Sequence, residues 1–220
     1  INIILNILLL VTFYIMIAGF GAYFEQEMGI NKIIGSSILA IMSAIVFFTS
    51  VKGVLKVSQY IVPVLIISIM IIGSINLLTL NVQTELPEIS KGWFLSSISY
   101  CSFNMILLIP VLISLRKQIT QDLSIRYISI ISGILMIIIS VMIYMLLVKV
   151  DTDISTLEMP VVYVVRTFFT NFKTLYAFII LSSIFTTAIS IGIGFLQNIS
   201  KTKKSYTQFV LFMCITSLII

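Results

Sequence analysis

The sequence alternates between long, uncharged apolar runs and short segments that hold the charged residues. The uncharged runs are residues 1–24, 33–51, 57–84, 92–115, 127–148, 174–200 and 205–220. A helix needs roughly 20 apolar residues, at about 1.5 Å of rise each, to cross a bilayer. Six runs are long enough, the shortest of them having 19 residues, and the seventh is cut off by the end of the sequence. This pattern predicts membrane-spanning helices at about residues 1–23, 33–51, 60–80, 93–115, 127–148, 175–196 and 206–220.

Composition supports an all-α, polytopic membrane protein with a single transmembrane domain. Hydrophobic residues make up 60% of the sequence, charged residues 10%, and the mean hydropathy is +1.20. Such values are typical of multi-pass helical membrane proteins. The sequence opens without a methionine and stops inside an apolar run, so we expect it to be a piece of a longer protein.

Basic and acidic residues separate from one loop to the next. The loops after the second, fourth and sixth spans together hold eight basic residues and one acidic residue, a net charge of +7. The alternate loops hold five basic and seven acidic residues, a net charge of −2. Because cytoplasmic loops carry the excess of lysine and arginine, the first span is expected to run outward and the fourth inward. Because the basic residues sort by membrane side, the isoelectric point of about 9.2 does not indicate a nucleic-acid partner. The expected partner is the lipid bilayer of the cell (inner, cytoplasmic) membrane.

The fourth span, residues 93–115, is polar in its first half. Seven of the nine residues from 96 to 104 carry a hydroxyl, thiol or amide: Ser96, Ser97, Ser99, Tyr100, Cys101, Ser102 and Asn104. Around an intact helix they would point in every direction, so no rotation hides them all from lipid. One interpretation is a helix that unwinds around a solute cavity, helped by Pro110. The other is a regular helix whose polar side chains bond to their own backbone carbonyls or act as small interhelical spacers.

Hydroxyl groups also line up in the sixth span. Ser183, Thr186 and Thr187 stand at i, i+3 and i+4 and so share one helix face, with Ser190 one turn further on. Hydroxyl and carbonyl oxygens suit a hard cation such as Na⁺. A packing seam of back-bonded side chains is the alternative.

Other chemistry has little support in the sequence. There is no histidine, and the two cysteines, Cys101 and Cys214, both fall in apolar runs. No carboxylate cluster is present either. Together, these absences argue against a metal, haem or disulfide site. No nucleophile, base and acid converge, so we expect no enzyme, no catalytic residue and no cofactor apart from a coupling ion.

The predicted outer segments contain two features. Glu25 and Glu27 precede a turn expected at Gly29 and are predicted to form a solvated face, with a gate to a vestibule as the alternative. Pro160 follows Glu158 as at the start of many helices, and residues 160–169 are predicted to form an amphipathic helix. That helix would either pack over the outer face or act as a lid.

Three stretches, in this order, resemble a known family: YIMIAGFGAYFEQEMGINK, VKGVLKVSQYIVPVL and WFLSSISYCSFNMILLIPVL. They resemble the YkvI family of bacterial membrane proteins, which is similar to the amino acid–polyamine–organocation transporters with the LeuT-type inverted-repeat fold. The resemblance covers nearly the whole sequence. It implies a partial inverted repeat, from the third helix of that fold to the start of the ninth. The first, fourth and sixth spans would then be the third, sixth and eighth helices, in the directions that the charges predict.

The resemblance also implies roles for individual residues. The broken sixth helix of the fold would bring to the solute the residues Ser97, Ser99, Tyr100, Cys101, Ser102 and Asn104. Ser183, Thr186 and Thr187 match the A/S-x-x-T-S/T spacing that such transporters use for sodium, and Tyr14 matches a third-helix aromatic that closes over the substrate. The first helix of the fold, which supplies half of both sites, has no counterpart here, so this piece is not expected to transport by itself.

We therefore hypothesise a secondary active transporter, a cation-coupled symporter of amino acids or similar small amine or zwitterionic solutes. No ionisable side chain lies deep in a span, which disfavours a carboxylate proton relay and favours Na⁺ over H⁺. The alternative is a non-transporting receptor or sensor subunit with the same fold, as in spore-germination receptors. A degenerate, non-functional piece is a third possibility.

Overall fold

The computed structural model describes residues 2–49, 51–79, 91–115, 122–148, 157–200 and 202–218. Every regular element in these ranges is a helix, which confirms the all-α class. The helices are α1 (Asn2–Met28), α2 (Lys32–Phe48), α3 (Val51–Thr79), α4 (Trp93–Leu115), α5 (Asp122–Val148), α6 (Pro160–Phe168), the 3-10 helix η2 (Thr170–Phe172), α7 (Lys173–Ile199) and α8 (Lys203–Thr216). Several begin or end a turn beyond the predicted spans, so the charged residues at the edges of those spans are helical too.

Among the described residues, three helices are long and apolar enough to cross a membrane, by length and composition: Ile3–Met28, Arg126–Val148 and Lys173–Ile199. Lys32–Phe48 and Tyr60–Ile75 are shorter apolar helices. These helices agree with a polytopic helical membrane protein, while the remaining spans stay predictions. Much of the charge used to orient the chain lies outside the described residues, namely Glu85, Glu88, Arg116, Lys117, Lys149, Asp151, Asp153 and Lys201.

The chain divides into two compact units. Unit 1 comprises Ile1–Ser68 and Asp151–Ile220, and unit 2 comprises Ile69–Val150. The single transmembrane domain expected from the sequence stays a prediction.

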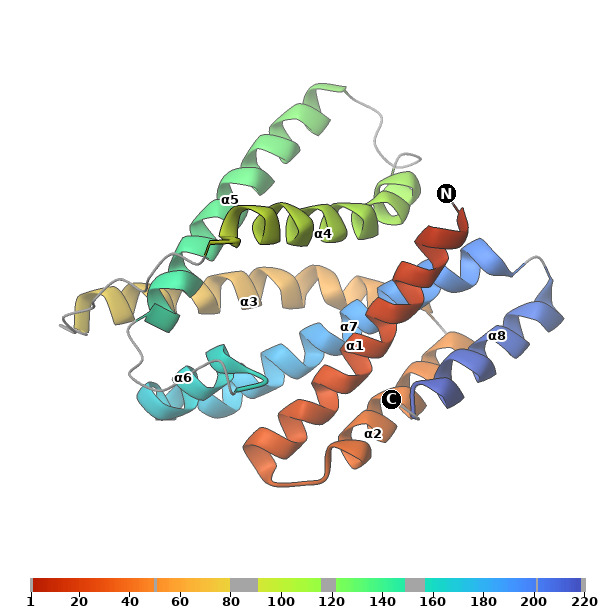
Figure 1. The fold of residues 1–220 in the computed structure, drawn as a ribbon, viewed down its shortest axis with the longest axis horizontal. Helices are drawn as coiled ribbons and strands as arrows, with labels where there is room; N and C mark the ends of the chain where they lie inside the picture. The colour runs from red at the N-terminus through yellow and green to blue at the C-terminus, as the bar shows by residue number, and fades with distance from the viewer. Residues whose placement is uncertain are drawn as a thin grey trace. The chain divides into compact units, whose positions relative to one another are not determined.

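In unit 1, α1 packs along both α2 and α7 (Figure 1). Each of the α-helices that lie wholly in the unit contributes a side chain with no exposed surface: Phe13, Leu39, Val164, Ile189 and Val210. The core of the unit is therefore shared by segments from both ends of the sequence.

Small residues set how closely α1 and α2 approach. A Cβ placed on Gly21 would lie 2.4 Å from the backbone oxygen of Lys32, and one placed on Gly35 would lie 3.0 Å from Gly21 Cα. The Ser36 hydroxyl uses this proximity to donate a hydrogen bond to the Ile17 carbonyl, 3.2 Å away. Gly29 makes the turn between the two helices with a φ of +65°, a conformation that a side chain disfavours.

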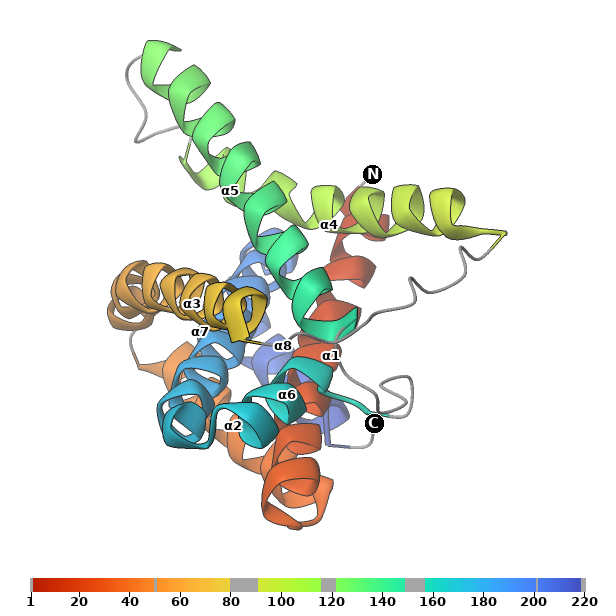
Figure 2. The same cartoon turned by 90° about the vertical axis from the view of Figure 1, so that its left-hand side faces the viewer.

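The amphipathic outer helix predicted from residue 160 is present as α6. It begins at Pro160 in the first helical position and buries three valines, Val162, Val164 and Val165. Figure 2 shows it beside the start of α7, which follows after the short η2 turn. Met159, the residue directly before α6, is bound to α1 by two hydrogen bonds. The Gln26 side-chain amide donates to the Met159 carbonyl at 3.2 Å and accepts from the Met159 N–H at 3.0 Å.

In unit 2, α4 is one uninterrupted helix (Figure 1). The predicted unwinding between Ser97 and Asn104 is therefore wrong. Ser97 Oγ donates to the Trp93 carbonyl and Asn104 Nδ2 to the Tyr100 carbonyl, both at 2.8 Å. These bonds within the helix satisfy the Ser97 hydroxyl and the Asn104 amide without a cavity. The alternative interpretation, a regular helix with side chains bonded to its own carbonyls, predicted such bonds.

Candidate functional site

The predicted solute residues fall into two groups on the intact α4. Ser97 and Asn104 use their polar groups one turn back along the helix. In the part of the chain that the structure describes, no hydrogen-bond partner is found for the side chains of Ser99, Tyr100, Cys101 and Ser102. These four keep polar groups available for a ligand, and their role in binding stays a prediction.

The predicted sodium residues lie on α7 and differ in burial. Thr186 is only 3% exposed, Ser183 is half-buried and Thr187 is exposed. The hydroxyl of Thr186 donates to the Ser183 carbonyl at 3.1 Å, and that of Ser190 donates to the Thr186 carbonyl at 2.8 Å. The buried side of this stripe therefore holds Ser183, Thr186 and Ser190, whereas Thr187 points away from it.

Tyr14, the predicted aromatic over the substrate, is half-buried on α1. Its hydroxyl forms a hydrogen bond with Thr216 Oγ1 of α8, 202 residues later in the sequence. Thr216 in turn donates to the Phe212 carbonyl at 2.7 Å. In this structure the Tyr14 hydroxyl joins two helices of unit 1. Because α4 belongs to unit 2, the expected convergence of Tyr14, α4 and the α7 hydroxyls on one solute stays a prediction.

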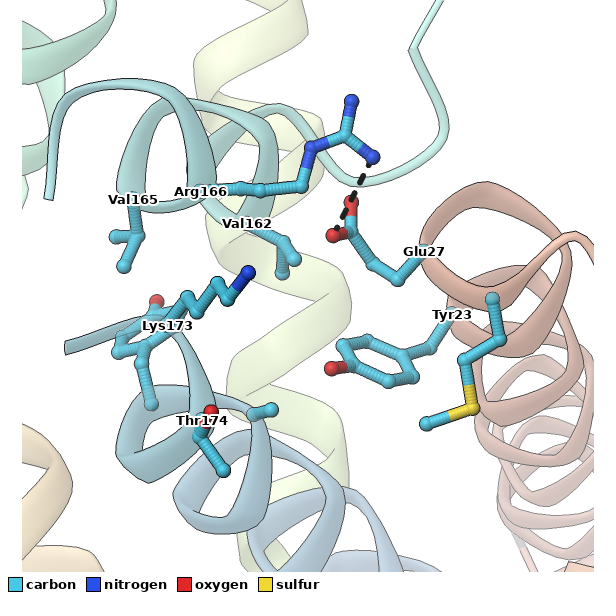
Figure 3. Close-up of a pocket in the computed structure, with 10 residues that line it drawn as sticks. Tyr23, Glu27, Val162, Val165, Arg166, Lys173 and Thr174 are labelled. Atoms are coloured by element: carbon cyan, nitrogen blue, oxygen red, sulfur yellow. Dashed lines mark ion pairs between the residues drawn. The ribbon is translucent and has the colours of Figure 1, made fainter. Parts of the chain in front are cut away.

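Unit 1 contains a cavity that the sequence did not indicate as a site. Its volume is about 240 Å³. It is lined by the end of α1, one side of α6 and the first turns of α7, through Tyr23, Glu27, Met28, Val162, Val165, Arg166, Lys173, Thr174, Tyr176 and Ala177. Figure 3 shows Lys173 extending toward the space between Val162 and Tyr23, on the side where Glu27 meets Arg166.

An ion pair lies at the wall of this cavity. Arg166 Nη1 and Glu27 Oε2 are 3.6 Å apart, and the Glu27 side chain is only 9% exposed against 45% for Arg166 (Figure 3). The solvated face predicted for the two glutamates is therefore right for Glu25, which is exposed, and wrong for Glu27. The reason is tertiary: α6, which begins 133 residues after Glu27, covers the end of α1.

Sequence reasoning missed Tyr23, Lys173 and Tyr176 as site residues. One signal was available, since Glu27, Arg166 and Lys173 all stand at the ends of apolar or amphipathic helices. If such ends meet at the same membrane face, their charges gather there. The charge count predicted that these three residues lie on the outer face of the membrane, but it could not predict which helix ends are neighbours.

Comparison with known proteins supports the membrane assignment. Over 209 residues, 94% of its length, the chain is 28% identical to a Bacillus subtilis (strain 168) protein named "Uncharacterized membrane protein YkvI". The chain spans 59% of the length of that curated relative. No family model matches the sequence, and no solved structure matches it. The further likeness to LeuT-type transporters stays a prediction, whereas the expected resemblance to YkvI is confirmed, and the chain is a membrane protein similar to YkvI.

Proposed function

We propose that this chain is part of a secondary active transporter, a multi-pass protein of the bacterial cytoplasmic membrane with no enzymatic activity of its own. It would move amino acids or similar small amine or zwitterionic solutes together with Na⁺. The observation that carries the proposal is the buried hydroxyl stripe on α7, with Thr186 at 3% exposure inside a helix long enough to cross a bilayer.

The chemistry of this stripe suits a hard monovalent cation. Hydroxyl and backbone oxygens bind such ions without a carboxylate, so that the ion's own charge remains to be driven by the membrane potential. The uncharged runs of the sequence place no carboxylate, lysine or arginine deep in a predicted span. A proton carrier normally needs such a group at membrane depth, which favours Na⁺ over H⁺ as the coupling ion.

The solute would contact the polar half of α4 through its side chains. Ser99, Tyr100 and Ser102 offer hydroxyls that are not bonded within the helix, and these can donate to a carboxylate or accept from an amine. Because α4 stays helical, its backbone groups are already paired, so recognition would depend on these hydroxyls.

Sodium-dependent thermal stability of the full-length protein in lipid nanodiscs tests the cation site. Thermal unfolding is followed in NaCl and in choline chloride at equal ionic strength, for the wild type and for Thr186→Val. Sodium is expected to raise the unfolding temperature of the wild type and to leave Thr186→Val unchanged. Thr207→Val serves as the control, because Thr207 also donates to its own helix, at 3.2 Å, but is itself exposed, on α8. A sodium response that survives Thr186→Val would contradict the proposed site.

The uninterrupted α4 gives a specific reason to test one alternative, a receptor or sensor subunit that binds solute without transporting it. A transporter has to change conformation around the solute, and a broken helix often supplies the hinge. Uptake by proteoliposomes with an inward sodium gradient separates the two functions. Binding of an amino acid without uptake would favour the sensor.

A further inference from the structure

We propose that the cavity between α1, α6 and α7 is a second small-molecule site, which binds the carboxylate of a small aliphatic acid. It lies wholly in unit 1, and its lining includes none of the residues of the α7 hydroxyl stripe. The proposal stands whether or not the protein proves to be a transporter.

The charges around the cavity favour a single negative group. Glu27 and Arg166 compensate each other at 3.6 Å, which leaves Lys173 as the additional cation of the lining. Lys173 is exposed, and no ion-pair partner for it is found in the described ranges of the chain. A carboxylate bound here would pair with Lys173 without displacing Glu27 from Arg166. Since Lys173 also begins α7, the positive end of that helix dipole adds to the attraction.

Polar groups beside Lys173 can complete the binding of a carboxylate. The Tyr23 side chain lines the cavity and is only 4% exposed, so its phenol is held in place by packing. Its hydroxyl points into the same space as the Lys173 ammonium group (Figure 3). A carboxylate can accept from an ammonium and from a hydroxyl at once, and hydrogen bonds to charged groups are the stronger ones.

Part of the lining is formed by small apolar side chains. Val162 and Val165 from α6 and Ala177 from α7 face the cavity. The volume of about 240 Å³ equals the liquid volume of roughly eight water molecules, which fits a short branched chain better than a large ligand. We therefore assign the carboxylate to the Lys173 end and an aliphatic body to the valines and Ala177.

Three related probes test this chemistry: leucine, 4-methylpentanoate, which lacks the amine, and 3-methylbutylamine, which lacks the carboxylate. Their binding to the full-length protein in nanodiscs is measured by isothermal titration calorimetry. The two carboxylates are expected to bind and the amine is not. Binding of leucine alone would mean that an amine is also required and would overturn a site selective for the carboxylate.

Variants assign the binding to the cavity. Lys173→Gln removes the charge of an exposed side chain and is expected to weaken 4-methylpentanoate at least tenfold. Lys203→Gln, an exposed lysine at the start of α8 outside the cavity, is the matched control and should bind as the wild type does. Ala177→Leu keeps every charge but fills the space beside the valines, and it should abolish binding.

The test also separates this site from the proposed transport site. Tyr100→Phe on α4, which removes one of the hydroxyls proposed to contact the transported solute, and Thr186→Val on α7 should leave 4-methylpentanoate binding unchanged. Loss of binding in either variant, with retention in Lys173→Gln, would place the acid at the transport site and overturn the proposal. The absence of binding by both carboxylates would overturn it as well.

Discussion

Single glycines decide how close the helices of unit 1 can come. Gly21 and Gly35 let α1 and α2 approach until the Ser36 hydroxyl reaches a carbonyl of the facing helix. Gly192 on α7 does the same for α2, because a Cβ there would lie 2.4 Å from Cζ of the buried Phe47 ring. In a membrane such contacts depend on van der Waals packing, since lipid tails are as apolar as the side chains.

Gly21→Ala is expected to destabilise the protein by about 1 to 2 kcal/mol. Moving a backbone carbonyl out of contact costs about 1–3 kcal/mol, and the better helix propensity of alanine returns less than about 1 kcal/mol. Thermal and denaturant unfolding in nanodiscs measure the change. Gly133→Ala on α5 is the control, because a Cβ there meets nothing within 4 Å. Equal stability of the two variants would contradict the close packing of α1 on α2.

Gly192→Ala should destabilise the protein by a comparable amount, for a different reason. Here the atom in the way is a side-chain ring, which a smaller residue can replace. Phe47→Leu by itself leaves a cavity, but combined with Gly192→Ala it should recover part of the loss. A double-mutant cycle on unfolding free energies measures this coupling, expected at about 0.5–3 kcal/mol. Strict additivity would mean that the two residues do not meet.

At the scale of elements, α6 shows how a contact between distant parts of the sequence sets the position of a helix. Its amphipathic pattern and its start at Pro160 could be predicted, because both are local properties. Its position could not, since that depends on Gln26, a residue 133 positions earlier that pairs with both backbone groups of Met159. For the same reason the ion pair of Glu27 with Arg166 could not be recognised, nor could Lys173 be recognised as part of a cavity.

α4 shows the opposite case, because hydrogen bonds within the helix replaced the partners that we expected elsewhere in the fold. The seven polar residues suggested that something outside the helix must meet them. Two of them, Ser97 and Asn104, meet carbonyls of their own helix instead. The sequence shows which side chains need a hydrogen-bond partner. It does not show whether that partner is the carbonyl four residues earlier in the same helix or a group elsewhere in the fold.

Gln26→Leu is expected to loosen α6 from α1 without unfolding the unit. The change removes two hydrogen bonds and leaves the Met159 N–H unpaired, at about 1–3 kcal/mol, whereas the Met159 carbonyl still accepts from the Tyr163 N–H at 3.2 Å. Hydrogen exchange read by mass spectrometry should therefore show faster exchange, by tenfold or more, over residues 160–168 and little change in α2. Gln208→Leu, an exposed glutamine on α8, is the matched control. Unchanged exchange over α6 would mean that its buried valines hold it in place without Gln26.

At the scale of the whole molecule, the distribution of charge makes a prediction that no single helix does. Glu158 precedes α6 and Lys204 lies in the first turn of α8, and α7 is the one long apolar helix between them in the sequence. If α7 crosses the membrane once, these two exposed residues lie on opposite sides. The excess of basic residues in alternate loops then places Lys204 in the cytoplasm and Glu158 outside.

Cysteine labelling tests both parts of this prediction. The natural Cys101 and Cys214 are first replaced by serine, and Glu158→Cys or Lys204→Cys is added singly. A membrane-impermeant maleimide applied to intact cells should label Glu158→Cys, whereas Lys204→Cys should react only after lysis. Labelling of both in intact cells would show that α7 does not cross. The reverse pattern would mean that α7 crosses the membrane in the opposite orientation. The cavity bounded by Glu27, Arg166 and Lys173 would then face the cytoplasm, and its ligands would be metabolic acids in place of external ones.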